Sequence, residues 1–74
     1  MNYYLQITVE RTASLDRVVE FFEGTAYTPR RFDERTVTLF PPDRISAGLA
    51  RREIEIYLRV LGRVHPEVGA TLLA

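Results

Sequence analysis

The chain has 74 residues, no cysteine, one histidine and a formal net charge of zero. A chain of this length forms one domain, residues 1–74, and so small a domain is often stabilised by disulfides, a metal or a partner subunit. The composition excludes a disulfide framework and a Cys/His zinc site, and the zero net charge provides no global field that attracts nucleic acid or an anionic membrane.

The first two predicted elements are a strand over residues 3–10 and a helix over residues 14–23. Apolar and polar residues alternate along the first segment, which is the period of a half-buried strand whose odd positions face the core. In the second segment apolar residues recur at i, i+3, i+4 and i+7, the period of one helix face. Ser14 is the predicted N-cap of this helix, and Gly24 ends it.

Three further strands complete the predicted sheet. The segment 27–32 contains Pro29, which cannot donate to a sheet ladder, so this strand is predicted at an edge. Residues 35–40 are rich in β-branched and aromatic residues and suit the interior, and residues 68–74 form a short last strand. The order β-α-β-β-α-β predicts an α+β, ferredoxin-like fold: a four-stranded antiparallel sheet in the order 4-1-3-2 with both helices on one face.

The second helix is predicted to begin at a cap, either Asp43 or Ser46, and to end near Arg63. Its apolar residues cover about half of its circumference or more, which is wider than the stripe of ~100° that a surface helix needs. The excess predicts either deep packing against the first helix or contact with another subunit. Glu53 falls inside the apolar arc, either at its rim, where its carboxylate reaches solvent or an arginine, or buried with a raised pKa.

The residues favour no enzyme activity, no cofactor and no metal site. His65 lies beside a helix end, where its ring can cap carbonyl groups, and no cysteine or second histidine completes a nucleophilic triad. All ten basic residues are arginine, which excludes lysine chemistry and is a bias reported in some thermophilic families.

The open face of the sheet is the predicted contact surface. If Val37 and Leu39 point to the core, the alternate residues of the third strand share a face with those of the first strand. That face is uncharged and carries aromatic rings, as dimer interfaces do. The predicted interface residues are Tyr4, Gln6, Thr8, Thr38, Phe40 and, from the second helix, Tyr57.

Nucleic-acid binding is an alternative, because the RNA recognition motif shares this topology and stacks bases on aromatic residues of its central strands. Tyr4 and Phe40 occupy such positions, and Arg30, Arg31 and Arg35 cluster on the predicted hairpin. The third strand, RTVTLF, lacks the Lys/Arg-Gly-aromatic run of that motif. Arginines on an edge strand also serve simply to discourage aggregation between sheets.

Residues 7–32, ITVERTASLDRVVEFFEGTAYTPRRF, resemble the opening half of an ACT-type regulatory domain, in particular the small regulatory subunit of acetolactate synthase. The resemblance rests on a helix of the type Leu-x-Arg-Val-x-x-x-Phe, and the matching residues are Leu15, Arg17, Val18 and Phe22. It implies a β-α-β-β-α-β fold and a small ligand, often an amino acid, held at a subunit interface near the first loop. The residues of this loop that would bind an amino acid or anion are Arg11, Thr12 and Ser14, helped by backbone amides at the helix start.

The sequence therefore predicts a non-enzymatic, ACT-like domain that acts through self-association, as a homodimer, and through protein–protein interaction, with a regulatory role. The alternatives are a sensor of a small ligand and an RNA-binding module. No apolar run approaches the ~20 residues that span a bilayer, and no basic segment followed by an apolar one opens the chain, so we expect no membrane contact and a cytoplasmic location.

Overall fold

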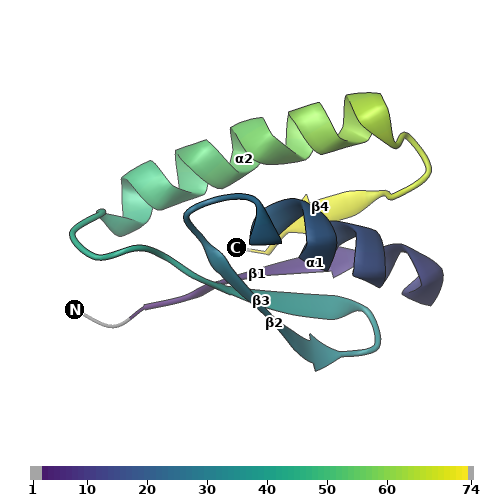
Figure 1. Ribbon diagram of the computed structural model, residues 1–74, viewed down its shortest axis with the longest axis horizontal. Helices are drawn as coiled ribbons and strands as arrows, with labels where there is room; N and C mark the ends of the chain where they lie inside the picture. The colour runs from purple at the N-terminus through teal and green to yellow at the C-terminus, as the bar shows by residue number, and fades with distance from the viewer. Residues whose placement is uncertain (1–2, 74) are drawn as a thin grey trace.

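The computed structural model describes residues 3–73 (Figure 1). In chain order the elements are β1 (Leu5–Val9), a 3-10 turn η1 (Thr12–Ser14), α1 (Leu15–Glu23), β2 (Thr28–Asp33), β3 (Thr36–Phe40), α2 (Ala47–Val64) and β4 (Ala70–Leu72). The fold is α+β: four strands pair antiparallel in one sheet of order β2-β3-β1-β4. Each predicted strand and helix is present, with ends that differ by a few residues, and Ala74 of the predicted last strand lies outside the described residues.

β1 is a central strand, because β3 pairs with one of its edges and β4 with the other. Its odd residues Leu5, Ile7 and Val9 are buried, whereas Gln6 and Thr8 are half-buried on the opposite face. The predicted alternation is therefore confirmed, and it fixes which side of the sheet the helices cover.

β2 lies at one edge of the sheet, which is the position that Pro29 predicts. Its pairing with β3 shifts between Arg31 and Asp33, so that Phe32 is the extra residue of a β-bulge, and this side chain is 67% exposed. Arg31 forms an ion pair with Asp16 of α1. The bulge and the charged side chains make this edge a poor template for a further strand.

The two helices begin differently. The Ser46 hydroxyl accepts a hydrogen bond of 3.2 Å from the backbone N–H of Leu49, so Ser46 rather than Asp43 caps α2. Ser14 precedes α1, but its backbone is helical and its hydroxyl makes no capping bond. Ser14 is the N-cap residue of α1, as predicted, but its hydroxyl does not cap the helix, because η1 runs directly into α1 and leaves this residue without the extended backbone of a capping serine.

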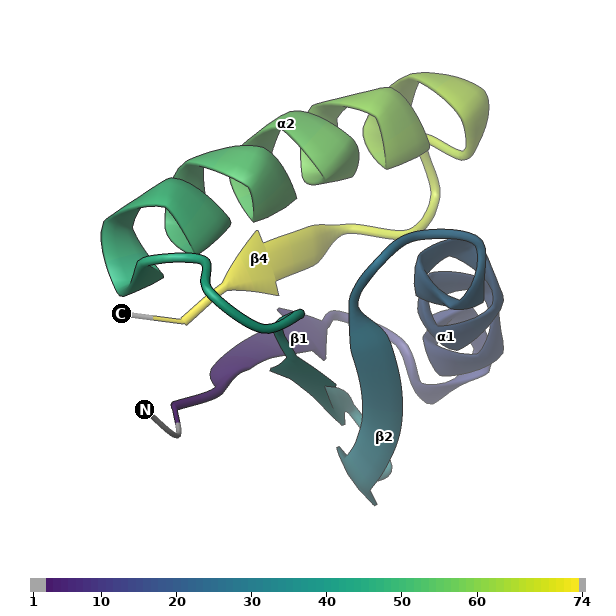
Figure 2. The same ribbon diagram turned by 60° about the vertical axis from the view of Figure 1, so that its left-hand side comes forward.

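Both helices pack on the face of the sheet to which the buried residues of β1 belong, and all share one apolar core. Figure 2 shows α2 lying over β4 and α1 beside β2. Four aromatic rings join the two helices to the start of β2: Tyr57 of α2 meets Phe21, Phe22 and Tyr27 edge-on, with ring centroids 5.8 to 6.2 Å apart. On the side of β2 the core is thus closed by aromatic rings, through which α2 packs against α1.

Candidate functional site

α2 carries an exposed line of apolar side chains, which we call the α2 stripe: Leu49, Ile56, Val60 and Val64. Their exposed fractions are 53, 54, 44 and 64%. At about 100° per residue these side chains fall within about 80° of one another around the helix, beside the strip that holds Arg52 and Arg59. Deep packing against α1 therefore does not account for the wide apolar arc of this helix.

The open sheet face, on the side away from the helices, brings together residues of three strands. Gln6 lies opposite Thr38 in the register and donates to its hydroxyl at 3.2 Å, and Arg30 lies opposite Thr38 from the other side. The rings of Tyr4 and Phe40 stand 6.2 Å apart at an angle of 53°, and the Arg30 guanidinium lies 5.6 Å from the centre of the Phe40 ring. Four of the predicted interface residues, Tyr4, Gln6, Thr38 and Phe40, are therefore neighbours, although Thr38 is only 7% exposed. Arg30 adds a charge that the prediction did not place among them.

Two predicted interface residues lie further away. Thr8 is on the same face, paired with Thr36 and half-buried, toward the β2–β3 hairpin. Tyr57 lies on the helix side of the sheet, half-buried against the rings of α1, so the structure does not bring it to the surface that Tyr4 and Phe40 form.

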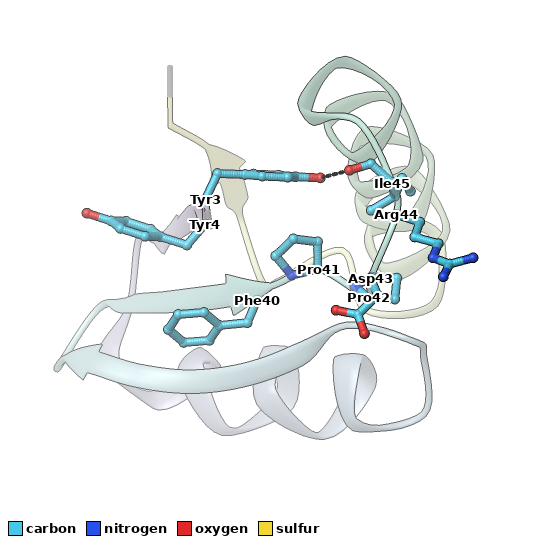
Figure 3. A pocket seen from close by; sticks show the side chains of 8 residues that line it. All are labelled: Tyr3, Tyr4, Phe40, Pro41, Pro42, Asp43, Arg44 and Ile45. Carbon is cyan, nitrogen blue, oxygen red and sulfur yellow. Dashed lines mark hydrogen bonds between the residues drawn. The ribbon is translucent and has the colours of Figure 1, made fainter. Parts of the chain in front are cut away.

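An aromatic cleft of about 580 Å³ opens beside the open sheet face, where β1 begins and β3 ends (Figure 3). It is lined by Tyr3, Tyr4, Phe40, Pro41, Pro42, Asp43, Arg44 and Ile45. The Tyr3 hydroxyl donates to the Ile45 carbonyl at 2.8 Å and ties the segment before β1 to the loop before α2. Sequence reasoning missed this cleft, although the pairs Tyr3-Tyr4 and Pro41-Pro42 flank the two central strands that it joins.

The turn that borders the cleft contains a residue with an unusual backbone conformation. Arg44 has φ of 68°, in the left-handed region, where a residue with a side chain is disfavoured by of order 1–3 kcal/mol. Of the residues 3–73, Arg44 is the one non-glycine residue with a positive φ. The loop between Pro42 and Ile45 therefore holds a shape that its sequence does not prefer locally, held in place by the Tyr3–Ile45 bond at one end and the Ser46 cap at the other.

The predicted ligand-binding residues Arg11, Thr12 and Ser14 lie together in and beside η1. Arg11 and Thr12 are exposed and Ser14 is buried. The Ser14 backbone N–H donates to the Arg11 carbonyl at 2.9 Å, so this amide is already used inside the turn. Binding of an amino acid or anion here stays a prediction that rests on the resemblance and on the exposed Arg11 side chain.

The single histidine joins the two helices. The Arg17 guanidinium of α1 lies 3.2 Å from Nε2 of His65, and the Glu67 carboxylate lies 3.6 Å from Nδ1 of the same ring. The His65 ring therefore faces a cation and a carboxylate, whereas the prediction had this ring cap helix carbonyls. The helix end is instead capped by the His65 backbone N–H, which donates to the Leu61 carbonyl. Among residues 3–73 no group of three or more His, Cys, Asp or Glu side chains gathers closely enough to hold a metal ion.

Tyr27 and Glu53 form the one side-chain hydrogen bond between the start of β2 and α2 that the described residues record. The Tyr27 hydroxyl, on a side chain that is 2% exposed, donates to Oε1 of Glu53 at 2.6 Å. Burial, and then the bond to Glu53, raise the pKa of Tyr27 well above its ordinary value. Glu53 is half-buried at the rim of the apolar arc, as one of the two predicted alternatives has it, but its partner is a tyrosine rather than an arginine.

Comparison with known proteins gives no relative: no family model, no curated protein and no solved structure matches the chain. Within residues 3–73, neither helix has the length and apolar character needed to cross a membrane. Three surfaces of the molecule therefore bear on its function: the α2 stripe, the open sheet face and the aromatic cleft.

Proposed function

We propose that this chain is a non-enzymatic interaction domain that associates with a second copy of itself through α2. We also propose that it is ferredoxin-like, because its strand order read from β4 is 4-1-3-2 and both helices pack on one face of the sheet. The observation that carries self-association is the α2 stripe, whose four apolar side chains are each about half exposed or more. Ile56, Val60 and Val64 lie at successive turns of one flank of the helix, and Leu49 lies on the same flank two turns before Ile56. Scattered single apolar residues need no explanation, but a contiguous line of them marks a contact surface.

The α2 stripe is self-complementary. A two-fold axis beside Tyr57, near the middle of α2, sets Leu49 opposite Val64 of the partner subunit, and Ile56 opposite Val60 of the partner subunit. The midpoint of the first pair lies between residues 56 and 57 and that of the second at residue 58, about 2 Å apart along the helix, so one axis brings both pairs into contact between two antiparallel α2 helices. The arginines of the neighbouring polar strip then lie at the solvent-exposed rim, where charges cost little.

Dimerisation would also add to the stability of so short a chain. A domain below about 70–80 residues rarely gains more than 3–5 kcal/mol from one core, and association is a common supplement. Burying the exposed half of one Ile or Val side chain contributes about 1 kcal/mol, half of the figure for full burial. Two such side chains on each of two protomers therefore contribute about 4 kcal/mol, which is about 1,000-fold in the dimer dissociation constant.

Light scattering and sedimentation over a range of concentrations test this proposal. We expect wild type to be a dimer, and the double variant Ile56→Gln/Val60→Gln to be a folded monomer at concentrations where wild type is dimeric. The matched control, Arg52→Gln/Arg59→Gln, changes two side chains of the adjacent polar strip and should remain dimeric. A wild-type chain that stays monomeric at every concentration, or a control that dissociates as readily as the stripe variant, would falsify the proposal.

A further inference from the structure

We propose that the aromatic cleft and the open sheet face bind a nucleobase that carries a phosphate, either as a free nucleotide or within a single nucleic-acid strand. The ligand would stack on the rings of Tyr4 and Phe40, and its phosphate would meet the guanidinium of Arg30. This function uses the side of the sheet away from the helices and does not depend on association through α2.

The rings provide the stacking surface. Tyr4 is 60% exposed and Phe40 is 37% exposed, although they lie at the ends of two central strands. Their planes open at 53° to each other, so they do not cover one another's faces, and a third planar ring can lie against either. Figure 3 shows Tyr4 directed away from the Tyr3–Ile45 bond, so that stacking on Tyr4 leaves the closure of the loop intact.

The charges around the rings favour an anion. Arg30 lies over the Phe40 ring, Arg44 lines the cleft, and Arg51 lines an adjoining cavity together with Tyr3 and Tyr4. Asp43 is the acidic residue that lines the cleft, and the guanidinium groups of Arg30 and Arg44 lie in the same region although the net charge of the whole chain is zero. Arg51 adds a third positive charge in the adjoining cavity, where it donates to the Leu73 carbonyl at 2.8 Å. Nucleic-acid binding depends on such local charge, which the net charge of the chain conceals.

Arg30 is available to a ligand. The ion pairs of arginine within residues 3–73 involve Arg17 and Arg31, and Arg30 has an aromatic ring as its neighbour instead of a carboxylate. A guanidinium that rests on a ring keeps its planar fork of donors free at the edge, and this fork matches two phosphate oxygens. The Gln6 amide lies across Thr38 from Arg30, and its nitrogen donates to the Thr38 hydroxyl, so its oxygen can accept a hydrogen bond from a base.

A second copy of the chain fits this face poorly. A two-fold contact through the open sheet face would enclose two Arg30 side chains, and the other residues of this face, Tyr4, Gln6, Thr8, Thr38 and Phe40, offer no acidic partner. The size of the cleft, about 580 Å³, is that of a small-molecule site. A stacked base with its phosphate therefore matches the shape, the rings and the charge together.

Fluorescence anisotropy of a fluorescein-labelled octauridylate with the full chain at low ionic strength tests the proposal. We expect saturable binding that weakens as salt is added. Tyr4→Ala should raise the dissociation constant about 5- to 150-fold, the range for one stacking aromatic residue, and Tyr4→Phe should bind about as tightly as wild type. Arg30→Gln should reduce the slope of log K against log salt by about 0.7.

Two controls match these variants. Phe32→Ala removes an aromatic ring that is as exposed as Tyr4 but lies outside the cleft, and Arg52→Gln removes an arginine on α2; both should bind like wild type. Displacement of the octamer by unlabelled uridine monophosphate supports the proposal and identifies a free nucleotide as sufficient, whereas binding of the octamer alone supports it and identifies a single strand.

The inference would be overturned if neither probe bound to a wild-type chain that melts cooperatively, or if Phe32→Ala weakened binding as much as Tyr4→Ala. Displacement by inorganic phosphate as effective as by the nucleotide would overturn it as well. A proline-rich peptide that binds in place of both nucleotide probes would assign the cleft to a different class of partner and would also overturn it.

Discussion

Replacing Tyr27 with phenylalanine removes one hydroxyl group from the rim of the core and leaves the ring in place. This hydroxyl donates to the Glu53 carboxylate at 2.6 Å. A hydrogen bond to a carboxylate contributes about 1.5–3 kcal/mol to stability when buried. Glu53 is half-exposed, so in the variant its carboxylate can accept a hydrogen bond from water instead, and the loss is smaller. We therefore expect Tyr27→Phe to lower the free energy of unfolding by about 1–2 kcal/mol, equivalent to a fall in Tm of roughly 5–15 °C for a chain of this size.

The same bond makes stability depend on alkaline pH. Burial and the bond to Glu53 hold the pKa of Tyr27 above its usual value of 10.0, so the protonated hydroxyl is favoured in the folded state. Its contribution is complete below pH 10 and is lost as pH rises above 10 toward the higher pKa of the folded state. The free energy of unfolding of wild type should therefore fall more steeply above pH 10 than that of Tyr27→Phe.

Urea denaturation at neutral pH and at a series of pH values above 10 measures both effects. The matched control is Tyr57→Phe: Tyr57 belongs to the same aromatic cluster, and the described residues record no hydrogen bond of its hydroxyl, so its loss should change stability by less than about 0.5 kcal/mol. The reasoning is refuted if Tyr27→Phe and wild type unfold at the same urea concentration at neutral pH, or if their slopes above pH 10 coincide.

Backbone geometry and helix capping give two further pairs of predictions, each checked by urea denaturation at neutral pH. Gly69→Ala should lower the free energy of unfolding by about 1–2 kcal/mol, because φ is +57° and the new Cβ would lie 2.9 Å from the Cδ atom of Glu10. Gly62→Ala should instead raise it by about 0.5–1 kcal/mol, because this helical position has no atom within 4 Å of the new Cβ and alanine favours the helix. Ser46→Ala should cost about 1 kcal/mol through loss of the α2 cap, whereas Ser14→Ala should cost less than half as much, because this hydroxyl caps nothing. A destabilised Gly62→Ala, or equal losses at the two serines, would contradict these readings.

The fold was predictable where the signal is local. Alternation in β1 fixes the buried face of its residues, and the missing N–H of Pro29 places β2 at an edge, since both follow from the covalent properties of a few neighbouring residues. Ser14 was correctly predicted as the N-cap position of α1, but its hydroxyl makes no capping bond, because the preceding residues form η1 and give Ser14 a helical backbone.

The candidate site was only partly predictable, because it depends on contacts between distant segments. The pairing of β1 with β3 explains why Tyr4 and Phe40 could be placed on one face from alternation alone. The cleft, by contrast, requires the hydrogen bond between Tyr3 and Ile45, which are 42 residues apart in sequence, and the positive φ of Arg44. No pattern of residue types in the sequence predicts either feature. The partner of Glu53 was missed for a similar reason, because Tyr27 approaches it only after β2 is placed.

The two proposed surfaces can be tested separately because of how the layers are arranged. The α2 stripe lies on the helix layer and the rings of Tyr4 and Phe40 lie on the face of the sheet away from it, with the buried residues of β1 and β3 between them. Substitution of an exposed ring on one side therefore removes no core contact that supports the helix on the other. A loss of dimerisation in Tyr4→Ala would mean that the ring itself contacts the second copy, and it would shift the assignment of the open sheet face from ligand to subunit.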